Sequence, residues 1–158
     1  MNYDDLNFRD LFRGHGLRHT RQRELVYSAL ASTMAHPTAD ELFQMVRSKD
    51  DGLSLATVYN TLDALCDCGL CRKLPTSMGA GPCRYDADIS PHVHVSTRDG
   101  RMLDVPTELS RRLLAGLDRA VVVEIEARLG VPLGDLSVQV VERVAQHAPH
   151  SPLATVAV

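Results

Sequence analysis

The sequence predicts an α+β protein with a helical first half and a smaller second half that mixes strands and helices. Capped helical patterns fill residues 4–68, strand patterns start only near residue 70, and helical patterns return after residue 106. At 158 residues the chain is long enough for one domain or two small ones. Because it contains no Trp, its core is expected to be aliphatic.

The first two helices are defined by their ends. A helix over about residues 4–14 ends at a pair of glycines, and Thr20 is a suitable N-cap for the next helix. Apolar spacing gives that second helix one buried face, expected to consist of Val26, Ala29, Leu30 and Thr33.

Capping residues also define the third and fourth helices. Thr38 is followed three residues later by Glu41, which is the pattern of a capping box. Ser54 caps a helix over about residues 55–68 that ends at Gly69. The faces expected to be buried are Ala39, Leu42, Phe43 and Val46 in one helix and Leu55, Val58, Leu62 and Leu65 in the other.

Two short strands, about residues 70–75 and 82–86, follow the fourth helix and are joined by a segment rich in glycine and proline. Helices followed by such a hairpin form a winged helix-turn-helix domain, here residues 1–86. In this arrangement the capped helix enters the major groove of DNA and the hairpin lies along the backbone.

The charge distribution is compatible with local contacts to phosphate. The net charge of −3 argues against a bulk binder of polyanions, yet five arginines between Arg9 and Arg23 face a single acid, Asp10. A solvated helix face explains the arginines equally well on charge alone.

The second half, residues 92–146, predicts a small α/β unit that a hinge at residues 87–91 connects to the first domain. It begins with a hairpin over about residues 92–105 that turns at Asp99-Gly100, a strong two-residue turn signal. Its few strands leave exposed edges unless a second copy covers them, and we therefore expect a homodimer.

Helices are expected at about residues 107–117 and 118–129, followed by a half-buried strand within Leu136–Val144. Residues 147–158, rich in Pro, Ser, Ala and His, are expected to form a flexible tail. The residues expected to face inward from the two helices are Leu109, Leu113, Leu114, Leu117, Val122, Ile125 and Leu129.

The run from Asp86 to Asp104 contains candidate metal ligands. His92 and His94 are two residues apart, so on a strand both imidazoles point to the same face. Together with the two carboxylates they form a nitrogen and oxygen set that suits iron, manganese or zinc better than copper(I). The alternative is an exposed polar hairpin edge with incidental histidines.

Five sequence blocks occur in an order that resembles the ferric uptake regulator family. The blocks are GLRHTRQR (16–23), HPTADEL (36–42), SLATVYNTL (54–62), RYD (84–86) and PHVH (91–94). The resemblance covers about residues 10–145 and implies a dimeric, metal-responsive bacterial repressor that binds an A/T-rich inverted repeat in double-stranded DNA. It implies neither an enzyme nor a membrane partner. With no secretory leader and no apolar run of about 20 residues, the protein is expected to be cytoplasmic.

The resemblance also implies a regulatory metal site. Its ligands would be His36, Asp86, His92, His94 and Asp104. The metal would be Fe²⁺ or Mn²⁺, with Zn²⁺ as the alternative. An ion that joins His36 of the first half to ligands of the second would set the angle between the halves, and so favour the shape that binds DNA.

Aspartate at both positions 86 and 104, and the pair Tyr59-Asn60, look most like the peroxide-sensing branch of the family. In that branch a ligand histidine is oxidised, which makes His36 and His92 the candidates here. Sensing of iron, zinc or haem iron by the same family is the alternative.

The resemblance and groove chemistry together suggest which residues contact DNA. Arg18 would reach an A/T-rich minor groove, where the negative potential is enhanced. Thr57, Tyr59 and Asn60 lie near the start of the capped helix, where Asn reads adenine and Thr or Tyr contacts a thymine methyl group or a phosphate.

The cysteines depart from the family pattern. Most members have a CxxC after the HxH motif, whereas this chain has Ser96–Gly100 there, so no structural zinc held by four thiolates is expected. The four cysteines are instead Cys66, Cys68, Cys71 and Cys83. Core packing is the favoured interpretation, and a relocated zinc or thiol-switch site is the alternative.

Two rivals to the metal-dependent repressor follow from these residues. One is a thiol-redox regulator that works through the four cysteines. The other is a mononuclear iron metalloenzyme built on a facial triad of two histidines and a carboxylate.

Overall fold

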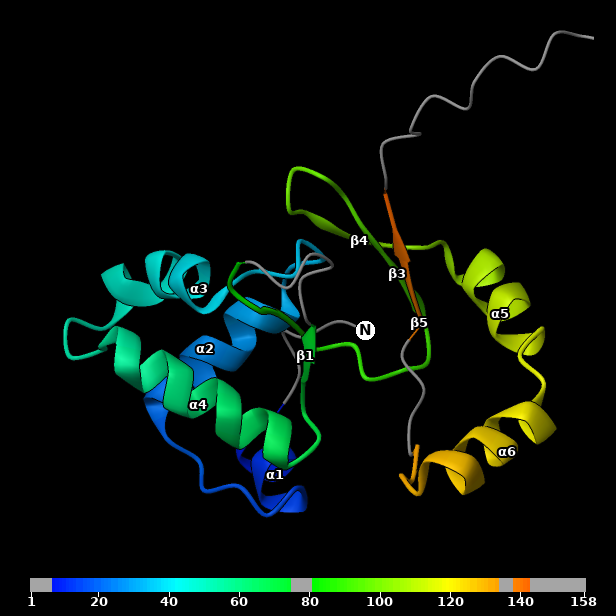
Figure 1. Ribbon diagram of the computed structural model, residues 1–158. Coiled ribbons are helices and arrows are strands. Elements are labelled where there is room, and N and C mark those ends of the chain that lie inside the picture. The colour runs from blue at the N-terminus through cyan, green and yellow to red at the C-terminus, as the bar shows by residue number, and fades with distance from the viewer. Residues whose placement is uncertain (1–6, 75–80, 134–137, 143–158) are drawn as a thin grey trace, which may run out of the picture.

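In a computed structural model of the protein, residues 7–74, 81–133 and 138–142 are described. Figure 1 shows two groups of elements: helices α1 to α4 with a two-stranded sheet, and a three-stranded sheet with helices α5 and α6. The predicted α+β class is confirmed. Predictions for the N-terminal six residues, for most of the wing loop and for the C-terminal tail lie outside the described residues.

The first two helices begin where a side chain caps them. Helix α1 spans Phe8–Gly14 and starts later than expected because Asn7 is its N-cap, accepting the Arg9 N–H at 3.1 Å. Helix α2 spans Arg21–Ala31, and Thr20 caps it as predicted. Thr33 was expected on the buried face of α2 but lies beyond the end of the helix.

The capping box before α3 (Ala39–Val46) is confirmed. Thr38 Oγ1 accepts the Glu41 N–H at 3.2 Å, and the Glu41 carboxylate accepts the Thr38 N–H at 2.8 Å. A 3₁₀ turn, Arg47–Lys49, connects α3 to the loop before α4. Helix α4 spans Leu55–Asp67 and is capped by Ser54, as the sequence predicts.

A two-stranded sheet follows α4, formed by β1 (Arg72–Leu74) and β2 (Arg84–Asp86) in antiparallel register. The helices and this sheet enclose the main core. Phe43 and Leu55, expected to be buried, are only partly buried, and Phe43 packs against the edge of this core. The core includes Phe12, Val26, Leu30, Leu42, Val46, Val58, Leu62, Leu65, Leu70 and Tyr85.

The second half contains a three-stranded sheet in the order β4-β3-β5. Strands β3 (Val93–Ser96) and β4 (Met102–Asp104) form the predicted hairpin, and β5 (Val138–Val141) pairs with β3 in parallel. The turn between β3 and β4 requires a left-handed residue, which Gly100 supplies with a φ of 81°.

Helices α5 (Thr107–Ala115) and α6 (Arg119–Leu129) form where predicted, and Gly130 ends α6 in the left-handed conformation. The expectation that their apolar residues face inward is wrong for the single chain, except at Val122. Helical spacing identifies an apolar face but not the surface that covers it. Among the residues expected inside, the exposed fraction is 46 % for Leu109, 50 % for Leu113, 43 % for Leu117, 40 % for Ile125 and 67 % for Leu129, while Leu114 is partly buried.

Within the described ranges, no helix is both long and apolar enough to cross a bilayer.

Candidate metal centre

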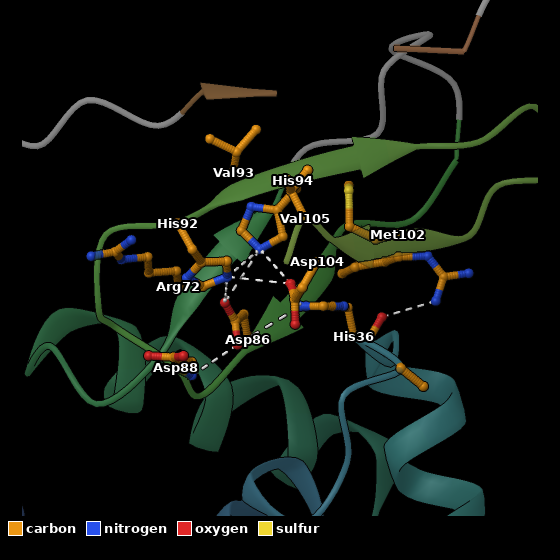
Figure 2. A network of polar contacts seen from close by, with 12 residues as sticks. His36, Arg72, Asp86, Asp88, His92, Val93, His94, Met102, Asp104 and Val105 are labelled. Atoms are coloured by element: carbon orange, nitrogen blue, oxygen red, sulfur yellow. Dashed lines mark hydrogen bonds and ion pairs between the residues drawn. The ribbon is translucent and has the colours of Figure 1, made fainter. Parts of the chain in front are cut away.

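Five side chains meet at the junction between the two halves of the molecule. Figure 2 shows them pointing toward one another from separate elements. They come from the segment before α3, the end of β2, the residue just before β3, β3 itself, and the end of β4. The five residues are those predicted from the sequence: His36, Asp86, His92, His94 and Asp104.

The potential ligand atoms are close enough to surround one ion. Four of the residues, all but Asp104, each offer a ligand atom within 4.8 Å of the others. Asp104 Oδ1 lies 3.0 Å from His36 Nε2 and 3.3 Å from His92 Nε2. The Nε2 atoms of His92 and His94 are 2.9 Å apart, and Asp86 Oδ2 is 3.2 Å from the first of them.

The sheet positions the ligands of the second half. His92 and His94 are two residues apart, and their rings share one face as the strand period requires. In the antiparallel register His94 is directly opposite Asp104, which brings these side chains together across the hairpin. The hairpin therefore supplies three of the five ligands.

The backbone at His36 is held in an unusual conformation by strand β2. Among the described residues, only one non-glycine residue, His36, has a positive φ, at 48°. This conformation costs on the order of 1 kcal/mol or more. The Arg84 guanidinium donates to the His36 carbonyl at 2.9 Å, and the Tyr85 N–H donates to the Pro37 carbonyl at 3.0 Å. These bonds direct the His36 side chain into the centre.

Backbone groups of residues 88 and 90 orient Asp86 and His92. Asp86 Oδ1 accepts the Asp88 N–H at 2.8 Å, which leaves Oδ2 facing the histidines. His92 Nδ1 lies 2.8 Å from the Ser90 carbonyl. Because a carbonyl only accepts, Nδ1 carries the proton and Nε2 presents a lone pair to the centre. The Arg72 side chain donates to the carbonyls of residues 89 and 90, and so holds the segment between Asp86 and His92.

Burial and charge favour a cation at this point. His36 and His94 are each 2 % exposed and Asp86 is 7 % exposed. Asp86 Oδ2 and Asp104 Oδ1 are buried and approach the histidine nitrogens without hydrogen-bond geometry. With neutral imidazoles the cluster carries two buried carboxylate charges, which a divalent ion would neutralise. The residues present therefore fit a divalent metal.

The pKa of the Asp86 carboxyl reflects the same environment. Burial raises this pKa, but interactions with the His94 imidazole and the Asp88 backbone N–H outweigh burial, so the pKa lies below its usual value. The carboxyl is therefore ionised at neutral pH, as a metal ligand must be.

The structure brings together three of the four candidate DNA contacts. Arg18, Thr57 and Asn60 line one open depression between the start of α2 and the outer face of α4. Tyr59 is not part of that lining; its hydroxyl donates to Asp40 Oδ2 at 3.1 Å. This hydrogen bond raises the pKa of Tyr59.

Three of the four cysteines pack in or against the helical core, and Cys83 is not among them. Cys71 is 3 % exposed, and Cys66 and Cys68 are partly buried beside it. Among the described residues, no cluster of three or more potential ligands includes a cysteine. Core packing is thus supported over a relocated zinc site.

Several supporting residues were missed by the sequence reasoning. The pattern of Asp86 and Asp88, each followed two residues later by a backbone N–H that it binds, is an Asx-turn signal that the sequence alone carries. The role of Arg84 had no such signal, because its partners are backbone carbonyls 48 and 16 residues away.

The winged-helix half, the α/β half and the His/Asp cluster between them define a class, that of metal-responsive winged-helix DNA-binding proteins. The profile of the ferric uptake regulator family matches residues 14–113, and the chain belongs to this family.

Similar proteins agree with this classification. The chain is 34 % identical over 93 residues to the peroxide-responsive repressor PerR of Staphylococcus saprophyticus, an alignment that covers 58 % of this chain and 62 % of that protein. It is 36 % identical over 90 residues to the peroxide operon regulator of Bacillus subtilis, covering 56 % and 61 %. The chain therefore spans about three-fifths of the length of these curated relatives.

A solved structure extends the likeness to most of the chain. The Campylobacter jejuni peroxide stress regulator superposes with a TM-score of 0.60 at 25 % identity, covering 90 % of this chain and 99 % of that one.

Proposed function

We propose that the protein is a metal-dependent transcriptional repressor that binds operator DNA as a homodimer in the bacterial cytoplasm. The observation that carries this proposal is the convergence of His36 and Asp86, from the first half of the chain, with three ligands at the β3–β4 hairpin. The three relatives named above are regulators, and the name of each refers to peroxide.

In this proposal His36, Asp86, His92, His94 and Asp104 hold one divalent ion. Three imidazole nitrogens and two carboxylates, without thiolate, favour Fe²⁺ or Mn²⁺, and Zn²⁺ is accepted by the same set. When bound, the ion supplies positive charge that joins the two halves. The relative orientation of the halves in which all five ligands reach the ion binds metal more tightly than other orientations. Metal binding therefore favours that orientation by this difference in affinity.

The two halves of the chain have different functions in this proposal. Residues 1–86 bind DNA, supported by the depression that Arg18, Thr57 and Asn60 share. Residues 87–91 form the hinge, and residues 92–146 bind metal and dimerise. The operator is an A/T-rich inverted repeat, because a two-fold symmetric protein reads two symmetric half-sites.

Homodimer formation is supported by the apolar side chains that α5 and α6 leave uncovered. Exposed apolar patches of this kind mark protein interfaces. Strands β4 and β5 lie at the two edges of the described three-stranded sheet and offer further pairing surface. The exposed apolar residues of this half include Leu109, Leu113, Leu117, Val121, Val123, Ile125 and Leu129.

We assign the signal to peroxide or iron, and place peroxide sensing at the metal ligands. His36 and His92 are the expected sites of oxidation in the iron-loaded protein.

The DNA test uses operator sequences selected from a random library with the Mn²⁺-loaded wild-type protein. Fluorescence anisotropy then gives the affinity with Mn²⁺ and with a chelator. We expect the chelator, or the substitution Asp104→Ala, to abolish the metal-dependent gain in affinity, whereas Asp51→Ala in an exposed turn keeps it. An operator affinity that changes neither with the chelator nor with Asp104→Ala would overturn the proposal.

The sensing test is mass spectrometry after peroxide treatment. The Fe²⁺-loaded protein should gain about one oxygen atom on His36 or His92, and the Mn²⁺-loaded protein should not. If the iron-loaded protein shows no such gain, the signal is the metal itself and peroxide sensing is excluded.

A further inference from the structure

A pair of thiols lies in contact outside the metal centre. The Sγ atoms of Cys66, in the last turn of α4, and Cys71, just before β1, are 3.1 Å apart. Both cysteines are free in this structure. The proposed function uses neither of them.

The end of α4 creates this contact. The Gly69 N–H donates to the Cys66 carbonyl at 3.0 Å, and the Leu70 N–H donates to the Leu65 carbonyl at 2.8 Å. These two bonds, with Gly69 at a φ of 75°, form a Schellman motif. The motif reverses the chain so that residue 71 lies beside residue 66, and the backbone hydrogen bonds hold the two sulfur atoms in place.

We propose that Cys66 and Cys71 form a reversible intramolecular disulfide in the folded protein, a redox site separate from the metal centre. A disulfide has a sulfur–sulfur distance of about 2.0 Å, so the atoms must approach by only about 1 Å. Side-chain rotation with small backbone adjustment supplies such a movement without unfolding the helix.

The two thiols are unequal, which assigns their roles. Cys66 is partly exposed, and the hydrogen bond with Cys71 lowers its pKa, outweighing burial and the nearby Asp63, which raise it. Cys71 is buried, and its hydrogen bond to Cys66, together with burial, raises its pKa. Because the thiolate is the nucleophile, Cys66 attacks the oxidant and Cys71 completes the disulfide.

The oxidant is hydrogen peroxide. The Cys66 thiolate attacks one peroxide oxygen, the O–O bond breaks, and the departing hydroxide takes a proton to become water, leaving a sulfenic acid. The Cys71 sulfur then attacks the Cys66 sulfur, the S–O bond breaks, and the leaving hydroxide takes the Cys71 proton. In total, two thiols and one peroxide give one disulfide and two waters. A dithiol reductant returns two electrons and two protons.

The disulfide would link two parts of the proposed repressor. Cys66 belongs to α4, the helix that carries Thr57 and Asn60 on the proposed DNA face. Cys71 precedes β1, in which Arg72 is paired with the candidate ligand Asp86. The cross-link therefore lies between the proposed DNA-reading helix and the strand pair that ends at the metal centre.

The test needs neither metal nor DNA, so its outcome is independent of the proposed function. Metal-free protein in excess chelator is treated with peroxide and unfolded in denaturant so that iodoacetamide reaches every free thiol, buried Cys71 included. The protein is then reduced and labelled with N-ethylmaleimide. Peptide mass spectrometry should find the second label on Cys66 and Cys71. The variants Cys68→Ser and Cys83→Ser should give the same result and serve as matched controls.

The intermediate is tested by removing the completing thiol. In Cys71→Ser, dimedone should trap a sulfenic acid on Cys66, while Cys66→Ser should show no adduct on Cys71. If wild-type protein keeps all four thiols open to iodoacetamide after peroxide, or if the second label falls on Cys68 or Cys83, the assignment is wrong. The wild-type measurement decides this even where a variant does not fold.

Discussion

Arg84 is a side chain that joins the two halves of the molecule through direct hydrogen bonds. Its guanidinium donates to the His36 carbonyl at 2.9 Å and to the Gly100 carbonyl, in the turn between β3 and β4, at 2.8 Å. The same group pairs with Glu41 at 3.1 Å. Its side chain is 15 % exposed; the contact to the His36 carbonyl is partly buried, whereas the contacts to Gly100 and Glu41 are exposed. The substitution Arg84→Met keeps the length and apolar stem of the side chain and removes every donor.

The expected loss follows from the three contacts. A hydrogen bond from a charged donor contributes about 1.5–3 kcal/mol, and an ion pair to a half-exposed carboxylate such as Glu41 contributes less than about 1 kcal/mol. The contact to the Gly100 carbonyl is exposed, so water replaces Arg84 there in the variant and this contact adds little to the loss. Arg84→Met should therefore lower the free energy of unfolding by about 2–4 kcal/mol.

Urea denaturation of the protein in excess chelator, followed by circular dichroism, measures this loss. The matched control is Arg111→Met, because the pair between Arg111 and Glu108 is 71 % and 69 % exposed and should change stability by less than about 0.5 kcal/mol. Since Arg84 also orients His36, Mn²⁺ affinity should fall about tenfold in Arg84→Met. An Arg84→Met protein as stable as wild type, or an Arg111→Met protein that loses as much, would refute this account of how the halves are joined.

Three further predictions concern the core, pH and metal. Leu62→Ala, at a site with no exposed surface, should lower the free energy of unfolding by about 2–5 kcal/mol, whereas Met34→Ala, at a site 78 % exposed, should leave the urea midpoint unchanged. Burial and the nearby Asp63 raise the pKa of Tyr85 to about 12 from 10.0. The folded chain thus keeps a proton that the unfolded chain releases, and stability should fall between about pH 10 and 12 more steeply in wild type than in Tyr85→Phe; equal slopes in urea titrations would contradict this. Mn²⁺ at about 100 times its dissociation constant should stabilise the native protein by about 2.7 kcal/mol per site, and a melting temperature that ignores both Mn²⁺ and chelator would contradict metal binding.

The helices were predictable because the interactions that start and end them are local. Thr20, Thr38 and Ser54 each cap a backbone N–H three residues ahead, as their spacing indicates. Where the prediction placed Thr33 on the buried face of α2, it extended an apolar spacing past the point at which the helix stops.

Part of the candidate metal centre was predictable for a similar reason. The two-residue period of a strand places His92 and His94 on one face, and the turn at Asp99-Gly100 sets the register that brings Asp104 opposite His94. The membership of His36 rested on family resemblance, since local spacing carries no information about a residue 56 positions before His92.

The sequence by itself determined the capped helices, the hairpins and the chemical nature of the ligands, because these depend on neighbours a few positions apart. Only the tertiary structure decided that His36 meets Asp86, that Arg84 joins two distant carbonyls, and that the apolar faces of α5 and α6 lie uncovered in one chain. These features depend on packing between elements remote in sequence. Apolar spacing predicts that one face of a helix will be buried. Which surface covers that face depends on the shape of the whole fold and cannot be read from the spacing.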